Sequence, residues 1–171
     1  MKSRNLIAIL VCALVAASGV WADEDAGAVV LRRGTAAFVV STPETKLDQR
    51  VLERLTAYLD AVLGEPSRVV DRLDAVPEQS PAIVIESSSS HGAAPEAFAL
   101  RTETRAGRSV VSAQGAVDRG RKRAVQRLIL LGEQREDALV FPPLDLVQQP
   151  WIPCREWSIC PWTPQDVRGD F

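Results

Sequence analysis

The amino-acid sequence predicts an α+β fold, a mixed β-sheet with two α-helices packed on one face. Three observations lead to this prediction. Short runs of apolar and β-branched residues recur along the chain, as expected for strands. Residues 44–63 instead space their apolar side chains with the period of a helix, and residues 118–131 are expected to form a second helix with a basic start and an apolar end. The resulting order, β-α-β-β-β-α with a trailing strand, fits a sheet that two helices cover on one face.

Two strands are predicted in the first half of the chain. Residues 36–41, AAFVVS, form a short apolar run that ends at Thr42-Pro43, because proline removes a backbone donor. Residues 82–86, AIVIE, are rich in β-branched side chains and predict a stronger strand. Between them, residues 69–70 can add a small strand.

Residues 44–63 carry the clearest helical pattern in the sequence. Their apolar side chains fall on one stripe and most charged side chains on the other side. Thr42 or Thr45 can cap the start of this helix, and Gly64 followed by Pro66 ends it.

A hairpin and a second helix are predicted between Pro95 and Leu131. Residues 97–103 and 108–114 have strand-like composition, and Gly107 between them can form the turn. The helix follows over residues 118–131, with a basic start and an apolar end. Together they form one strand-turn-strand-helix unit.

The connection into the second helix contains two glycines, Gly115 and Gly120. A phosphate-binding loop would need lysine directly after the second glycine, followed by serine or threonine, and this sequence has neither. We therefore interpret the glycines as shaping the strand-to-helix connection, with Asp118 as a candidate helix cap.

Positive charges crowd the start of the second helix, where each opposes the helix dipole by a few tenths of a kcal/mol. We expect solvent or the acidic groups of a neighbouring domain to offset them, and an anionic ligand is the alternative. The cations are Arg119, Arg121, Lys122, Arg123 and Arg127.

The sequence divides into three parts. Residues 1–22 have a positive start, an apolar run at 6–17 and small residues before Ala22, the pattern of a signal peptide. That run is shorter than the roughly 20 residues of a membrane-spanning helix, so a secreted or periplasmic protein without a membrane span is predicted. Residues 29–150 form one domain that ends in an edge strand at 144–147, and residues 151–171 form an irregular tail.

Charge and composition exclude several classes of protein. Without Lys2 and Arg4 of the signal peptide, 18 basic residues face 22 acidic ones, a net charge of about −4 that argues against nucleic-acid binding. His91 is the single histidine, so a histidine-rich zinc site and a Ser-His-Asp triad are not predicted. Cys154 and Cys160 suit neither a redox motif nor a zinc knuckle, and can be free thiols or a small-loop disulfide. The sequence predicts no cofactor, no metal and no catalytic acid-base pair.

The tail concentrates the aromatic residues of the chain. Trp151, Trp157 and Trp162 occur among prolines without any helical or alternating period. Aromatic rings bind sugar rings and are enriched at interfaces, and large apolar patches rarely stay bare. The tail therefore predicts either carbohydrate binding or contact with a further domain.

Several of these segments together resemble the N-terminal accessory domain of glycoside hydrolases. The segments are AIVIE at 82–86, PEAFAL at 95–100, the glycine turn and helix at 115–131, and PLDLVQQP at 143–150. The resemblance is to the domain before the barrel in family 20 β-N-acetylhexosaminidases, which α-glucuronidases carry in related form. It covers roughly residues 36–157, by layout more than by strict motif. Gln148 stands where that family has an aspartate, and arginines and a valine replace an aromatic-glycine pair.

This resemblance implies a β-N-acetylhexosaminidase-like sheet with two helices on one face that is not itself catalytic. The family's catalytic acids lie on later strands of a (β/α)8 barrel, and this chain stops before any of them. The implied partner is that barrel, which would be missing from a truncated chain. Arg155 falls near an arginine that contacts substrate in family 20, and Trp157 is a second candidate substrate-binding residue.

The leading hypothesis is therefore a non-catalytic accessory domain of a secreted glycoside hydrolase that acts on amino-sugar or uronic-acid polysaccharides. The alternative is a free-standing carbohydrate-binding module that uses Trp151, Trp157 and Trp162. A third interpretation is an unrelated protein of the cell envelope. The sequence does not select a polysaccharide or an oligomeric state.

Overall fold

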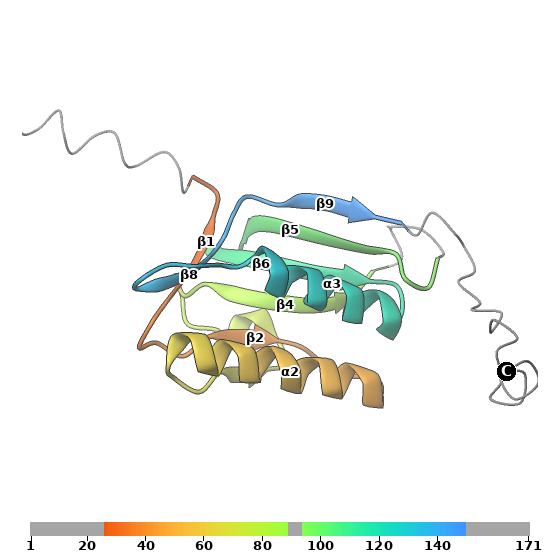
Figure 1. Ribbon diagram of the computed structural model, residues 1–171, viewed down its shortest axis with the longest axis horizontal. Coiled ribbons are helices and arrows are strands. Elements are labelled where there is room, and N and C mark those ends of the chain that lie inside the picture. Colours follow the sequence, from red (N-terminus) through yellow and green to blue (C-terminus); the bar gives the residue numbers. More distant parts are fainter. Residues whose placement is uncertain (1–25, 89–93, 150–171) are drawn as a thin grey trace, which may run out of the picture.

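The computed structural model describes residues 26–88 and 94–149, which form nine strands and two α-helices (Figure 1). The predicted signal peptide, His91 and the tail at 151–171 lie outside the described residues. The elements are β1 (Val29–Arg32), β2 (Phe38–Val40), α2 (Lys46–Leu63), β3 (Arg68–Val70), β4 (Ala82–Ser87), β5 (Phe98–Arg105), β6 (Arg108–Gly115), α3 (Asp118–Leu131), β7 (Glu133–Gln134), β8 (Ala138–Phe141) and β9 (Asp145–Gln148), with a short 3-10 helix at Leu73–Ala75.

The main sheet has six strands in the order β3-β2-β4-β6-β5-β9. Strands β3, β2, β4 and β6 are parallel, whereas β5 is antiparallel to both β6 and β9. The predicted α+β class and the mixed sheet are confirmed. The trailing strand forms the sheet edge, as its position in the sequence predicts.

A second, three-stranded sheet of order β1-β8-β7 was not predicted. Its longest pairing joins Val29 to Phe141, two residues at opposite ends of the domain. The two strands of this pairing are far apart in the sequence, and each is only four residues long. No local pattern in the sequence therefore indicates that they pair. The prediction of a single sheet is therefore wrong in this detail.

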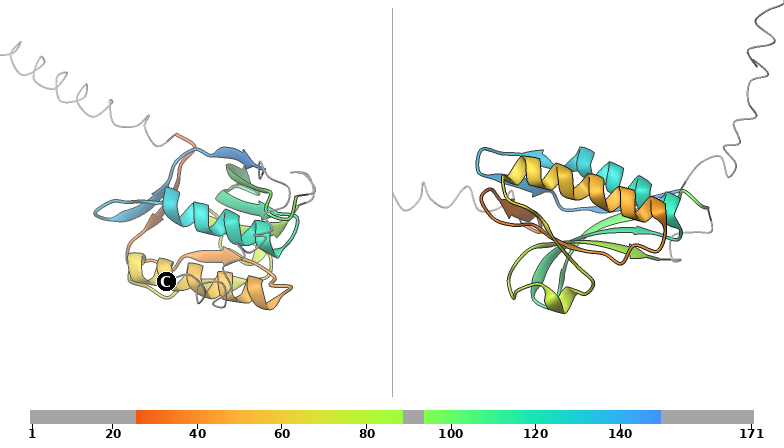
Figure 2. Two further views of the ribbon diagram at one scale, coloured as in Figure 1. Left: turned by 45° about the vertical axis from the view of Figure 1, so that its right-hand side comes forward. Right: turned by 90° about the horizontal axis from the view of Figure 1, so that it is seen from below.

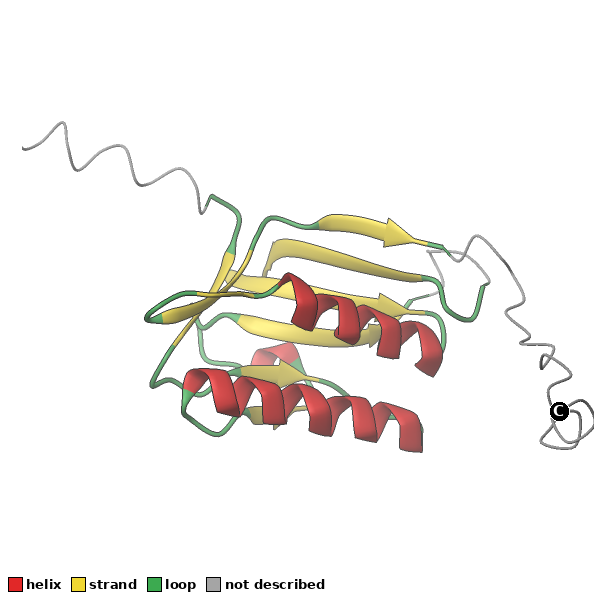
Figure 3. Ribbon diagram, viewed as in Figure 1, coloured by secondary structure: helices red, strands yellow, loops and turns green. Residues whose placement is uncertain are grey.

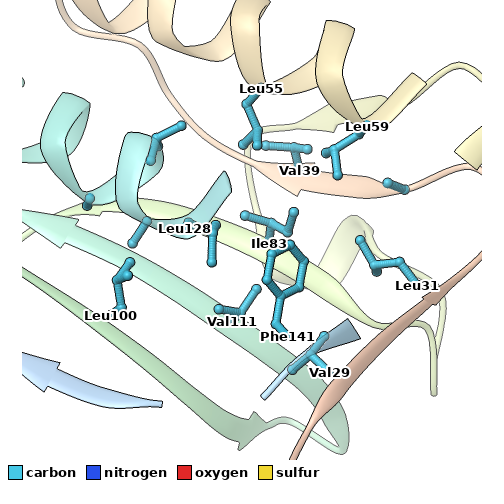
Figure 4. Close-up of a cluster of buried hydrophobic side chains, with 14 of the residues drawn as sticks. Val29, Leu31, Val39, Leu55, Leu59, Ile83, Leu100, Val111, Leu128 and Phe141 are labelled. Atoms are coloured by element: carbon cyan, nitrogen blue, oxygen red, sulfur yellow. The ribbon is translucent and has the colours of Figure 1, made fainter. Parts of the chain in front are cut away.

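Both helices lie side by side on one face of the main sheet (Figure 2). Each begins beside the carboxyl ends of the parallel strands and runs back across the sheet, so the two helices point in the same direction, as the colours of Figure 1 show; Figure 3 shows the same helices against the strands. Between helices and sheet lies the larger apolar core, which includes Leu55, Leu59, Leu128 and Phe141 (Figure 4). Phe141 comes from the small sheet, which therefore closes one end of this core.

The opposite face of the main sheet is covered only in part, by the segment between β3 and β4. A smaller apolar cluster lies there, with Val76 packed against Val84 and Val110. Arg108 holds this segment in place, since its buried guanidinium donates hydrogen bonds to the carbonyl oxygens of Val76, at 2.7 and 3.0 Å, and Pro77, at 3.3 Å.

Local signals in the sequence account for the ends of the main elements. Ala106 and Gly107 both have positive φ angles, 48° and 74°, as a two-residue hairpin turn with right-handed twist requires. Thr45 caps α2, and Gly64 ends it in the left-handed conformation with φ 80°. Asp118 is not the cap of α3, because Val117 occupies that position and makes no side-chain cap hydrogen bond.

The two glycines before and within α3 allow its start to lie directly on the chain beneath it. A β-carbon on Gly120 would lie 2.5 Å from the carbonyl oxygen of Ala97, and one on Gly115 would collide with the backbone nitrogen of Arg121. The interpretation that these glycines shape the strand-to-helix connection agrees with this packing.

Among the described residues, no helix is long and apolar enough to cross a membrane.

Candidate functional site

Polar side chains gather where the parallel strands end and both helices begin. The carboxyl ends of β2 and β4 lie on either side of a small cavity of about 160 Å³. In open sheets with parallel strands this edge is where ligands bind, next to the point where the strand order reverses. The polar residues around the cavity are Ser41, Thr42, Glu44, Asp48, Asp71, Glu86, Ser87 and Arg121.

A buried ion pair between Asp48 and Arg121 forms the centre of this site. The guanidinium donates from Nε to Oδ1 at 2.8 Å and from Nη2 to Oδ2 at 2.7 Å, a bidentate geometry. Both side chains are almost fully buried, at 6% and 7% exposure. The pair joins α2 to α3 across 73 positions of sequence.

Arg121 has two further partners. Its Nη1 donates to the hydroxyl of Ser87 at 2.5 Å, and Nη2 lies 3.3 Å from a carboxylate oxygen of Glu44. The expectation that solvent or a neighbouring domain offsets the basic start of α3 is therefore wrong for Arg121. Its counter-ion lies within the same domain.

Asp48 also completes the cap of α2. Its carboxylate accepts hydrogen bonds from the backbone nitrogen and the hydroxyl of Thr45, both at 3.1 Å, and its own backbone nitrogen donates to that hydroxyl. This is a capping box with aspartate in the place of glutamate. One carboxylate thus fixes the start of α2 and the position of α3.

The environment keeps Asp48 ionised. Burial raises the pKa of Asp48, but the hydrogen bonds and charge of Arg121, with the hydrogen bonds of Thr45, outweigh it and hold the pKa below the ordinary 3.8. The hydrogen bonds to Asp48 also raise the pKa of Arg121, despite the burial of its guanidinium.

A second polar cluster continues from this edge onto the helix-free face of the sheet. Arg105 binds Glu86 bidentately, at 2.8 and 3.0 Å, and lies 2.7 Å from Glu103. Gln114 donates to the same carboxylate of Glu86 at 2.5 Å. The hydrogen bonds from Arg105 lower the pKa of Glu86, and burial raises it. Together with the hydrogen bond from Gln114, those from Arg105 outweigh burial and hold the pKa below its ordinary 4.5.

These carboxylates are suited to holding the fold together rather than to proton transfer. A general acid or base works best with a pKa near the operating pH, and both Asp48 and Glu86 are shifted away from it. Their oxygens are already occupied by arginine and by backbone or amide donors. Within residues 26–88 and 94–149, no group of three histidine, cysteine, aspartate or glutamate side chains is placed to hold a metal ion.

We expect acid to destabilise the fold through these two carboxylates. Because their pKa values are lower in the folded state than in the unfolded chain, their contribution is fully present above the unfolded values of 3.8 and 4.5 and is lost as the pH falls through the folded values. Urea unfolding between neutral pH and about pH 3 is expected to show this loss, with a smaller slope for Asp48→Asn. Asp145→Asn is the control, because that carboxylate is 81% exposed. A slope for Asp48→Asn equal to that of the wild type would contradict the assignment.

The outer surfaces of the two helices enclose a groove of about 750 Å³. Its floor is apolar, with Val51 and Val125 buried and Ile129 half-buried. Arg50, Arg54 and Lys122 stand at its sides, and in the described part of the chain no ion pair involves any of them. This groove is a candidate docking surface for a partner with an apolar ridge.

The structure does not place the substrate-binding candidates of the sequence. Arg155 and Trp157, like Trp151 and Trp162, lie outside the described residues. Sequence reasoning missed Asp48 and Glu86, and it treated Arg121 as one of several surface cations. The available signal was an aspartate three residues after Thr45, which is the spacing of a capping box.

No protein-family model matches the sequence, and no curated protein matches it. The fold is similar to solved glycoside hydrolases. These include a GH115 4-O-methyl-α-glucuronidase with specificity for decorated arabinogalactans (TM-score 0.53, 16% identity, 84% of this chain and 22% of that one). A GH20 exo-β-N-acetylglucosaminidase from Vibrio harveyi (0.51, 13%, 72% and 17%) and a GH20 β-N-acetylhexosaminidase from Streptomyces coelicolor A3(2) (0.50, 15%, 72% and 24%) are others. At these identities the likeness shows the fold, and the chain spans at most about a quarter of each of these enzymes.

Proposed function

We propose that the chain is a non-catalytic accessory domain of a secreted carbohydrate-active enzyme. The observation that carries the proposal is the extent of the likeness, which covers 84% of this chain but 22% of the GH115 enzyme. A domain that forms a minor part of several different glycoside hydrolases is suited to supporting a catalytic domain. The resemblance of residues 95–100 and 115–131 to the domain before the family 20 barrel supports the same role.

The chemistry of the described residues supports a structural role. Asp48 and Glu86 are committed to arginine partners, so these two carboxylates at the carboxyl edge of the sheet stabilise the fold. The partner in this proposal is a (β/α)8 barrel that acts on amino-sugar or uronic-acid polysaccharides. The groove between α2 and α3 is the surface that suits it, because its apolar floor would be covered on docking.

Export and substrate contact belong to the same proposal. Residues 1–22 would direct the chain out of the cytoplasm, and amino-terminal sequencing of the exported protein is expected to begin at Asp23. Arg155 and Trp157 would lie close to the sugar site of the barrel. An exported protein that still begins with residues 1–22 would contradict the signal peptide.

Two measurements on the purified chain test the proposal. An accessory domain is expected to hydrolyse neither aryl β-N-acetylglucosaminides nor aryl α-glucuronides, and clear turnover would refute it. The DNA after codon 171, or the adjoining gene, is expected to encode a barrel.

The alternative, a free-standing carbohydrate-binding module, rests on the tryptophans of the tail. It predicts binding of chitin or xylan oligosaccharides by the chain alone, measured by titration calorimetry. Loss of that binding in Trp157→Ala would favour the module over the accessory domain. Full binding by this variant would exclude a role for Trp157.

A further inference from the structure

A second groove, of about 420 Å³, runs along the other side of α3. It lies above the sheet edge, and its lining includes Phe98 at the start of β5 and Gln148 at the end of β9. Arg123, Arg127 and Leu130 of α3 form the wall of the groove. This groove adjoins the one between α2 and α3, and Gln126 lines both.

The wall of this groove presents one large apolar side chain to solvent, among polar and charged ones. Leu130 is 75% exposed, the largest exposed fraction among the large hydrophobic residues described. Its neighbours in the groove are the cations Arg123, which lies 3.6 Å from Glu96, and Arg127, for which no ion pair is recorded in the described part of the chain. An occupant that suits this mixed surface has an aromatic ring that can lie on Leu130 and the guanidinium groups, and a polar group for the amide and carboxylate side chains around them.

The chain itself supplies such an occupant beside the groove. Gln148 is the last residue of β9 and lines the groove, and Trp151 follows three positions later. Three extended residues span about 10 Å, and Arg123 and Leu130 are seven residues apart along α3, also about 10 Å. Residues 151–164 can therefore reach every part of the groove.

The distribution of tryptophan also favours this occupant. All four tryptophans lie outside the described residues, and three of them fall within residues 151–164. Each tryptophan side chain buries about 150–250 Å² when it packs, and a guanidinium over its ring adds a cation–π interaction. We propose that the tryptophan-rich segment 151–164 docks into the groove beside α3, with an indole ring against Leu130 and Arg127.

This inference goes beyond the proposed function and does not depend on it, but it limits one part of it: if Trp157 is the ring packed on Leu130, only Arg155 is left to lie close to the sugar site of the barrel. It assigns the groove beside α3 to the chain's own tail and leaves the groove between α2 and α3 to a partner. It also bears on the carbohydrate-binding alternative, because a tryptophan packed on Leu130 is not a free platform for sugar.

Tryptophan fluorescence of the full chain tests the proposal without a ligand. In a Trp21→Phe background the signal comes from the tail alone, since the described domain contains no tryptophan. We expect emission shifted to shorter wavelength, and weaker quenching by acrylamide, relative to the same protein in denaturant. Leu130→Asp and Arg127→Glu, each in this background, are expected to lose that shift while the far-ultraviolet circular dichroism stays unchanged.

Matched controls lie elsewhere on the surface. Val69→Asp replaces another exposed apolar residue, on β3 at the opposite edge of the sheet, and Arg33→Glu reverses an exposed cation in the turn after β1. Both are expected to keep the emission of the parent. Unshifted emission of the parent chain, or an unchanged shift in both Leu130→Asp and Arg127→Glu, would overturn the proposal. A shift that appears only at high protein concentration would also overturn it, because a second copy would then cover the tryptophans.

Discussion

Arg121→Met is expected to lower the free energy of unfolding by about 3–5 kcal/mol, the cost of leaving a buried charge without its partner. Asp48 would keep its position in the cap of α2 but lose the two hydrogen bonds, of 2.8 and 2.7 Å, that offset its burial. Methionine fills much of the volume of the arginine stem, so the loss reports the charge rather than a cavity. Urea unfolding at neutral pH, followed by circular dichroism, measures the effect.

Two further variants separate the ion pair from general disruption. Asn at position 48 keeps an acceptor for Thr45 without a charge, so Asp48→Asn combined with Arg121→Met is expected to be more stable than Arg121→Met alone. Burial would raise the pKa of Asp48 in the Arg121→Met variant, so the penalty should shrink as the pH falls and the carboxyl takes up a proton.

Lys122→Met is the control, because Lys122 is the next residue of α3 and has no described ion pair. Its free energy of unfolding is expected to stay within about 0.5 kcal/mol of the wild type. A similar small effect for Arg121→Met would show that the pair contributes little.

The sequence predicted well those elements that local residues determine. The second helix was expected at 118–131 and begins and ends at those residues, and the hairpin strands were expected within two residues of β5 and β6. A glycine turn, a helical stripe and a run of β-branched residues each act over a few positions. Thr45 rather than Thr42 is the cap, because only Thr45 has an aspartate three residues later.

Features that join distant residues were not predicted, because the signals that can be read from a sequence act over only a few positions. The small sheet pairs residues near 30 with residues near 140, and the Asp48–Arg121 pair spans 73 positions. Arg121 looks like its basic neighbours in the sequence, yet it alone among them is buried. Arg121 lies on a different side of α3 from Lys122 and Arg123. Only the packing of α3 against α2 shows that an acidic partner, Asp48, lies on that side.

Gly120, which lies within this basic segment, is the site of the second substitution for which we expect a large loss of stability. Helix propensity alone predicts that Gly120→Ala would stabilise a helix by about 1 kcal/mol. We expect the opposite here, a loss of at least about 2 kcal/mol, because the new β-carbon would meet fixed backbone. It would lie 2.5 Å from the carbonyl oxygen of Ala97 and 3.2 Å from the α-carbon of Gly115, and neither atom can rotate away.

The start of α3 would have to lift from the chain below it to admit the methyl group, and Arg121 would move with it. Gly120→Ala should therefore also weaken the Asp48 ion pair, so its effect and that of Arg121→Met are expected to be less than additive when combined. Gly34→Ala provides the control, because that glycine has φ 73° and nothing within 4 Å of an added β-carbon. This variant is expected to lose only about 1–2 kcal/mol of stability, the cost of holding one alanine in the left-handed conformation. Thermal unfolding of the two single variants, their combination and the Gly34→Ala control tests this: a Gly120→Ala protein as stable as the wild type would mean that α3 does not rest on Ala97 in solution.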